Sequence, residues 1–222
     1  MSKRTVFDRR TLLLTLAAAG LLARPGLALA DPATDKADLQ RIADYFNGVR
    51  SLQGRFLQIA PDGSASEGSL QMRRPGRFRF EYDPPSPAQP SPLLIVSDGS
   101  FITMEDRQLK SVDKLPLTST PLDILVRDKV SFDDPSLKVS RLERGAGILR
   151  VTLADAAKPQ DGRIILSFTD RPLQFTGWTV IDGQGLPTAI SLSKLDFNPE
   201  LPDSLFDYGP RPAQMRELQR RR

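Results

Sequence analysis

The side chains that most enzymes use for nucleophilic or metal chemistry are missing from this sequence. Its 222 residues include no histidine and no cysteine, which excludes a Ser-His pair, a thiolate nucleophile and the usual zinc ligand sets. The carboxylate pairs Asp133–Asp134 and Asp203/Asp207 stand in proline-bearing, turn-like segments without a calcium-loop pattern. We therefore predict no catalytic residue, metal site or cofactor. The chain is expected to be a binding protein or carrier, with a hydrolase as the disfavoured alternative.

One charged residue interrupts an otherwise apolar pattern. Within residues 66–74, Leu70 and Met72 alternate with polar residues, and Arg74 has the same parity as these two. The two-residue period of a strand therefore aims Arg74 at the apolar face. A buried cation is costly unless it is hydrogen bonded or paired. Two interpretations stay open from parity alone, a side chain that snorkels to water from a strand end and a buried one with partners.

The elements that would position Arg74 form a hairpin within a larger sheet. Pro75-Gly76 is a turn pair, and Phe78, Phe80 and Tyr82 then alternate with charged residues in a second strand. Similar alternation between turn signals predicts an antiparallel meander that forms a curved sheet or barrel. Its strands are expected near residues 52–60, 66–74, 76–83, 93–97, 100–105, 108–113, 137–144, 147–154, 163–169, 174–182 and 187–197.

Two short helices are predicted beside these strands. The first is expected to end near Gly48 and has apolar residues at helical spacing, namely Leu39, Ile42, Ala43 and Phe46. The second would start with Thr120 as its N-cap and Pro121 as its first residue, with a short apolar face of Leu122, Leu125 and Val126. Because it interrupts a meander, this helix must lie on the sheet or cover an opening.

Several strands are apolar on both faces. Ile164, Leu166 and Phe168 alternate with Ile165, which a single sheet layer open to water would not need. This pattern fits either a fully packed core under the helices or the lining of a cavity. Between two of the strands, residues Pro84–Pro92 include five prolines and cannot form a strand interior, so we expect an exposed loop there.

The two ends of the chain differ from its body. Residues 1–30 have a basic start, an apolar run from Thr11 to Leu22 and a small-residue motif ending at Ala30, which predicts a secretory signal peptide cleaved after Ala30. Arg9-Arg10 fits either a twin-arginine or a general export signal. The apolar run is too short for a membrane span, so the protein is expected to be soluble and exported.

The excess of basic over acidic residues lies at these ends. Residues 1–30 hold five Lys/Arg and one Asp, so removing them leaves equal numbers of basic and acidic side chains. We expect one domain at 31–208 and a basic, disordered tail at 209–222, whose arginines could contact anionic lipid head groups. A nucleic-acid partner loses its support once the ends are set aside.

Five short motifs stand in order along the chain: Phe56-x-Gln58, Gly68-x-Leu70, Arg74-Pro75-Gly76-x-Phe78-x-Phe80-x-Tyr82, Leu94-x-Val96-Ser97-Asp98-Gly99 and Thr120-Pro121-x-x-Ile124-Leu125. Their order and spacing resemble the LolA family, the periplasmic carriers of outer-membrane lipoproteins. The resemblance implies a mainly β (α+β) fold, a curved antiparallel half-barrel of about eleven strands closed by a lid of short helices over an apolar cavity. It covers nearly the whole chain after the signal peptide.

The same resemblance implies a function and its residues. A periplasmic, monomeric carrier would take lipoproteins by their acyl chains from an inner-membrane ABC transporter and deliver them to an outer-membrane acceptor. Arg74 would close the lid by bonding helix-end carbonyls, expected near residues 46–48 and 126–128. The cavity would be lined by Phe56, Leu70, Met72, Phe78, Phe80, Tyr82, Leu122 and Leu125, and the lid helices would include Leu39, Ile42, Phe46 and Pro121. A periplasmic sensor of the same fold, regulating an envelope partner protein, is the alternative.

Overall fold

A computed structural model describes residues 32–120 and 122–209 of the chain. The predicted signal peptide at 1–30, Pro121, and the predicted tail after Gly209 lie outside the described residues. No helix within the described ranges combines the length and the apolar character that crossing a membrane requires.

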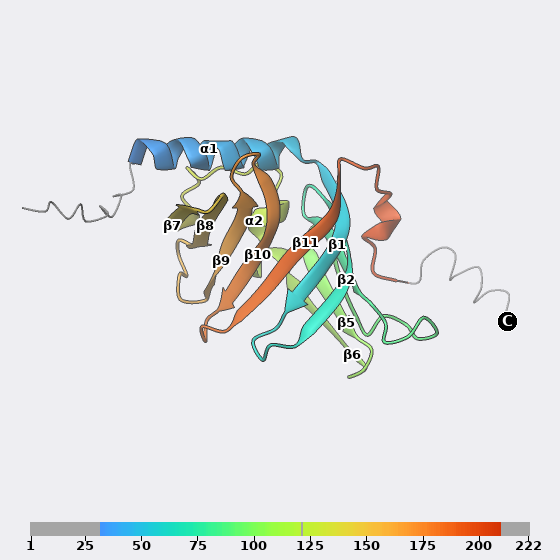
Figure 1. The fold of residues 1–222 in the computed structure, drawn as a ribbon. Helices are drawn as coiled ribbons and strands as arrows, with labels where there is room; N and C mark the ends of the chain where they lie inside the picture. Colours follow the sequence, from blue (N-terminus) through green and yellow to red (C-terminus); the bar gives the residue numbers. More distant parts are fainter. Residues whose placement is uncertain (1–31, 121, 210–222) are drawn as a thin grey trace, which may run out of the picture. The chain divides into compact units, whose positions relative to one another are not determined.

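The described chain is built on one antiparallel sheet of eleven strands (Figure 1). Its spatial order is β6-β5-β4-β3-β2-β1-β11-β10-β9-β8-β7. Strands that are neighbours in sequence therefore pair, except β6 and β7, and β1 also pairs with β11. The strands are β1 (Ser51–Ile59), β2 (Ala65–Arg73), β3 (Arg77–Tyr82), β4 (Leu93–Asp98), β5 (Phe101–Asp106), β6 (Ser111–Pro116), β7 (Leu137–Gly145), β8 (Ile148–Asp155), β9 (Gly162–Thr169), β10 (Gln174–Asp182) and β11 (Pro187–Phe197). This confirms the mainly β half-barrel, in which β6 and β7 are the two free edges.

Strand register decides which side chains face the interior. In the β2–β3 hairpin, Leu70 pairs with Phe80 and Met72 pairs with Phe78, so these four side chains share the inner face. On β1, Phe56 pairs with Gly68 of β2. A Cβ at position 68 would lie 2.5 Å from the Phe56 ring, so only glycine gives this ring its room. The aromatic face of the hairpin therefore points into the curve of the sheet, as the alternation predicts.

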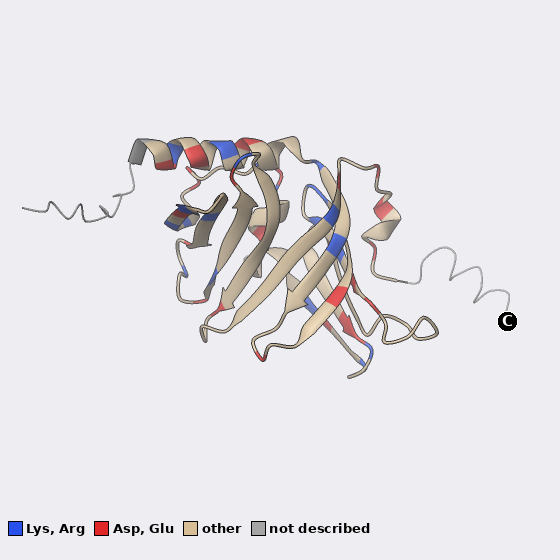
Figure 2. Cartoon of the chain, viewed as in Figure 1, with Lys and Arg blue, Asp and Glu red and all other residues tan. Residues whose placement is uncertain are grey.

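Helices lie at one end of the sheet and inside its curve. α1 (Pro32–Gly48) runs across the ends of β7–β10, and α2 (Asp123–Val126) lies within the curve (Figure 1). Two 3-10 turns, η1 (Leu117–Ser119) and η2 (Asp203–Leu205), complete the list of helical elements in the described chain. Residues of both charge signs follow one another along α1 (Figure 2), while its apolar residues Ile42, Ala43 and Phe46 are buried.

Two predicted boundaries were wrong, those of β6 and α2. β6 begins at Ser111 rather than near residue 108, because the Asp106 carboxylate accepts from the backbone N–H groups of Gln108 and Leu109 and holds them in a turn. α2 begins at Asp123, after Leu122. Thr120 does not cap it: the N-cap position is Leu122, which makes no side-chain cap hydrogen bond, and the Thr120 hydroxyl donates to the carbonyl of Leu117.

Candidate functional site

The predicted lining residues meet in one hydrophobic cluster enclosed by the sheet, α1 and α2. The buried members among the predicted cavity and lid residues are Ile42, Phe46, Phe56, Leu70, Met72, Phe78, Phe80, Tyr82 and Leu125. Leu39 and Leu122 are partly buried against the cluster, and Pro121 is not among the described residues. The structure thus brings together side chains from both halves of the hairpin, from β1 and from the two helices.

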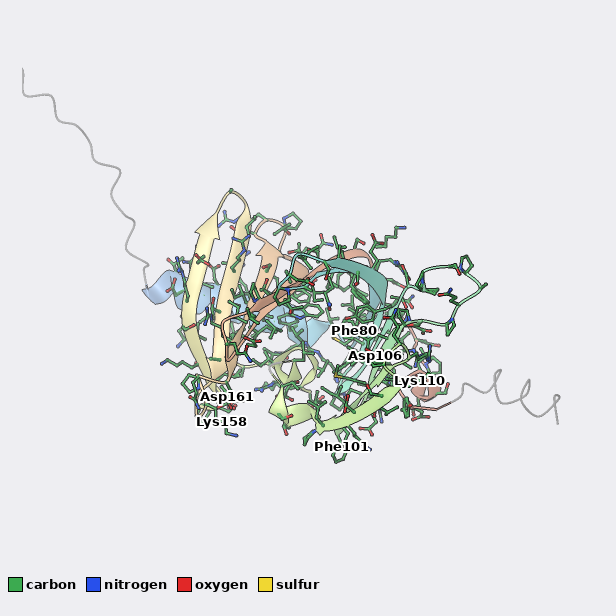
Figure 3. All side chains as sticks on the ribbon, turned by 90° about the horizontal axis from the view of Figure 1, so that it is seen from below. Phe80, Phe101, Asp106, Lys110, Lys158 and Asp161 are labelled. Atoms are coloured by element: carbon green, nitrogen blue, oxygen red, sulfur yellow. The ribbon has the colours of Figure 1, made fainter. Side chains whose placement is uncertain are left out.

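Aromatic rings form the centre of this cluster. Phe80 makes edge-to-face contacts with Phe56 at 5.4 Å, with Phe78 at 5.6 Å and with Trp178 at 6.0 Å between ring centroids. In the view from below, Phe80 lies within the curve of the sheet, whereas Lys158 and Asp161 lie at the edge of the sheet (Figure 3). Sequence reasoning did not include Trp178, a residue of β10 that is 3% exposed, in the lining.

Arg74 is buried directly below the helices. Its side chain follows β2, is 8% exposed, and donates from Nη2 to the carbonyl oxygen of Leu125 in α2 at 2.9 Å. The guanidinium also faces the Phe46 ring of α1 at 5.3 Å. The snorkelling interpretation was therefore wrong. The expected carbonyl from the first helix was wrong too, because α1 contributes a ring face instead.

Burial changes the electrostatics of Arg74. Desolvation lowers the pKa of Arg74 to about 10, although the charge of Asp128 acts in the opposite direction. The second terminal nitrogen, Nη1, is buried and has no hydrogen-bond partner. The guanidinium is therefore charged at neutral pH, and its hydrogen-bonding capacity is only partly satisfied.

The interior beside Arg74 is nearly filled. A cavity of about 20 Å³ lies between the end of α1, the starts of β1 and β10, and α2, with a lining that includes Phe46, Leu52, Met72, Arg74 and Leu125. This is room for about one water molecule, whereas sites for drug-sized ligands occupy about 300–1,000 Å³. The structure therefore shows a closed arrangement in which the apolar side chains pack against one another.

Ion pairs attach α1 to the sheet. Asp38 of α1 binds Arg144 of β7, Nε to Oδ2, at 2.5 Å, and Arg41 contacts Asp170, after β9, at 3.2 Å. Burial alone would raise the pKa of Asp38, but hydrogen bonds from Arg144 and Arg41 hold it below its usual value. The partners are 106 and 129 residues apart in sequence, so no local pattern could have identified these contacts.

The burial of Tyr82 can be tested through the pH dependence of the free energy of unfolding. Its hydroxyl donates to Gln58 Oε1 at 2.7 Å, and desolvation raises the pKa of Tyr82 to about 12. In the unfolded chain, Tyr82 loses its proton near pH 10. The stabilisation that the folded state gains from holding Tyr82 in its neutral form is therefore complete below about pH 10 and is lost as the pH rises through about 12. We expect the free energy of unfolding, measured with urea, to fall over this interval more steeply than for Tyr82→Phe. Parallel pH curves for the two proteins would contradict a buried Tyr82.

The chain matches a known family over most of its length. Residues 47–209 match the family described as outer membrane lipoprotein carrier protein LolA. A protein of Pseudomonas paraeruginosa named outer-membrane lipoprotein carrier protein is 30% identical over 211 residues, covering 91% of this chain and 96% of that protein. A protein of the same name from Azotobacter vinelandii is 27% identical over 198 residues, covering 85% of this chain and 91% of that protein.

Solved structures also align with this chain at low sequence identity. The crystal structure of LolA superfamily protein NE2245 from Nitrosomonas europaea aligns with 76% of this chain and 97% of that chain at 12% identity, with a TM-score of 0.42.

Proposed function

Because the chain belongs to the LolA family of outer membrane lipoprotein carrier proteins, we propose that it binds the acyl chains of lipoproteins released from the inner membrane and delivers them to the outer membrane. In this proposal the protein acts in the periplasm, as a monomer, and catalyses no reaction. The transporter that loads it and the acceptor that unloads it are an inner-membrane ABC transporter and an outer-membrane lipoprotein receptor.

The chemistry of the interior supports an acyl ligand. The sheet, α1 and α2 enclose a large cluster of buried apolar side chains, and burying a methylene group contributes about 0.8 kcal/mol. A cavity of about 20 Å³ cannot hold a fatty-acyl chain, so loading requires the covering elements to move away from the sheet. The aromatic cluster of Phe56, Phe78, Phe80 and Trp178 would then face the ligand.

The observation that carries the proposal is the bond between Arg74 and α2. The Arg74 guanidinium reaches from the sheet to the Leu125 carbonyl and so holds a covering element over an apolar interior. Breaking this bond on loading costs free energy, which keeps cargo affinity low enough for later release. Transfer can then proceed downhill to an acceptor with higher affinity, without any nucleotide bound by the carrier.

The test is identification of the bound cargo. The full-length protein, exported in a Gram-negative host and recovered from the periplasm, is expected to carry lipoproteins that intact-mass spectrometry identifies as acylated. In titrations of the purified protein, an acylated lipoprotein N-terminal peptide should displace an apolar fluorophore, and the same peptide without acyl chains should not. Equal displacement by both peptides, or a periplasmic preparation that holds only a protein regulator, would favour the sensor alternative.

A further inference from the structure

α1 is fixed to the sheet along its length. Asp35 and Asp38 near its start bind Arg144 of β7, and Arg41 binds Asp170. At its other end, the side-chain amide of Asn198 accepts from the backbone N–H of Arg50 at 2.7 Å.

The same amide bridges the junction between α1 and β1. Its Nδ2 donates to the Gly48 carbonyl at 3.3 Å, so Asn198 contacts both sides of the junction. Movement of α1 as a whole would therefore break contacts at both of its ends.

The α2 segment, residues 122–136, is attached differently. Arg127 pairs with Asp123 at 2.6 Å and with Asp134 at 2.9 Å, which ties α2 to the loop that follows it. These ion pairs lie within the segment, so they make it a unit without fastening it to the sheet.

A bond from the Ala156 N–H, just after β8, to the Ser136 carbonyl at 2.9 Å holds the far end of this unit. Three polar contacts fasten its α2 end from one side. The β2–β3 turn supplies the Arg74 bond to Leu125 and a bond from the Gly76 N–H to the Val126 carbonyl at 2.7 Å. An ion pair between Arg50 and Asp128, at 3.7 Å, is largely exposed and contributes little.

Asn47 of α1 holds the other side of the α2 segment. Its Nδ2 donates to the Val130 carbonyl at 3.0 Å, and its Oδ1 accepts from the Val130 N–H at 2.8 Å. The side-chain amide thus satisfies both backbone groups of a buried residue, as a neighbouring strand would. Asn47 is adjacent to Phe46, whose ring faces Arg74, so the part of α1 that holds Val130 also contacts the arginine that holds Leu125.

We propose that Asn47 is a positioning residue that holds the α2 segment closed in parallel with Arg74, and that this segment, rather than α1, moves when the interior opens. The inference deepens the proposed function by naming the moving part of the lid. It concerns the empty protein, so it can fail while the carrier function stands, and the carrier function can fail while the movement is observed.

Thiol labelling can follow each element separately, because the chain has no native cysteine. Ile124→Cys reports on the α2 segment and Ala43→Cys reports on α1; both native side chains are 4% exposed. We expect a small thiol reagent to label position 124 faster than position 43 in the empty full-length protein. Adding Asn47→Leu should raise the labelling rate at position 124 by roughly 5- to 100-fold, since two hydrogen bonds are lost, and should leave the rate at position 43 within about twofold.

Two further variants separate the positioning role from a general loss of stability. Asn47→Asp keeps an acceptor for the Val130 N–H but loses the donor, so its labelling at position 124 should be intermediate, and it also serves if Asn47→Leu does not fold. Gln40→Leu removes another amide of α1, whose hydrogen bond to Asp44 stays within the helix, and should change neither rate. An equal rise at positions 43 and 124, no rise at either, or a larger rise at position 43 would each overturn the proposal.

Discussion

Replacing Arg74 with leucine is expected to give a protein that binds acylated cargo more tightly and transfers it poorly. The substitution removes the charge-assisted bond to the Leu125 carbonyl, worth about 1.5–3 kcal/mol, and adds apolar surface beside Met72 and Leu52. The closed state loses this stabilisation while the loaded state does not. Cargo affinity should therefore rise by roughly 10- to 100-fold.

Two measurements check this result. Titration with a fluorescent acylated peptide gives the affinity, and transfer of a loaded lipoprotein to outer-membrane vesicles gives the release. Lysine carries a point charge in place of the planar guanidinium group, so Arg74→Lys should be intermediate in cargo affinity and in transfer. Arg73→Leu is the matched control, because Arg73 binds the Leu201 carbonyl and Asp203 instead of α2, and it should transfer normally. Unimpaired transfer by Arg74→Leu would show that the bond to α2 has no role in release.

Replacing Phe80 with glutamate is expected to abolish binding of an apolar fluorophore such as a naphthalene sulfonate. Phe80 is 6% exposed and its ring contacts Phe56, Phe78 and Trp178. A carboxylate at this position has no cationic partner in the aromatic cluster. It would cost several kcal/mol of stability or draw water into the interior. In a variant that stays folded, the charge and the water remove the dry apolar surface that the fluorophore needs.

Fluorescence titration and urea unfolding, measured together, distinguish the two outcomes. A folded variant that no longer binds the fluorophore would assign Phe80 to the ligand-facing interior, whereas a variant that unfolds outright would assign it to the permanent core. Phe101→Glu is the control, because Phe101 on β5 is 42% exposed, and it should keep both stability and binding. A Phe80→Glu protein with normal fluorophore affinity would contradict a role in the lining.

Alternation of side chains made most of the sheet predictable. Period-two patterns and turn pairs are local properties of the chain, and a meander connects neighbours in sequence, so the strands and their order follow from them. The same period placed Leu70, Met72, Phe78 and Phe80 on the inner face, and it aimed Arg74 at them. Errors arose where a single side chain redirected the backbone, as Asp106 does before β6.

The partners of the inward-facing residues were decided by tertiary structure alone. Parity shows that Arg74 faces an apolar surface, but only the fold brings the Leu125 carbonyl, 51 residues away, within 2.9 Å of it. The bonds between Asn47 and Val130 join residues 83 positions apart, and the α1 ion pairs span more than a hundred. Such contacts depend on where whole elements lie, which no local period encodes. The closed interior is likewise a result of packing, because the same apolar pattern serves a lined cavity and a filled core until α1 and α2 are placed against the sheet.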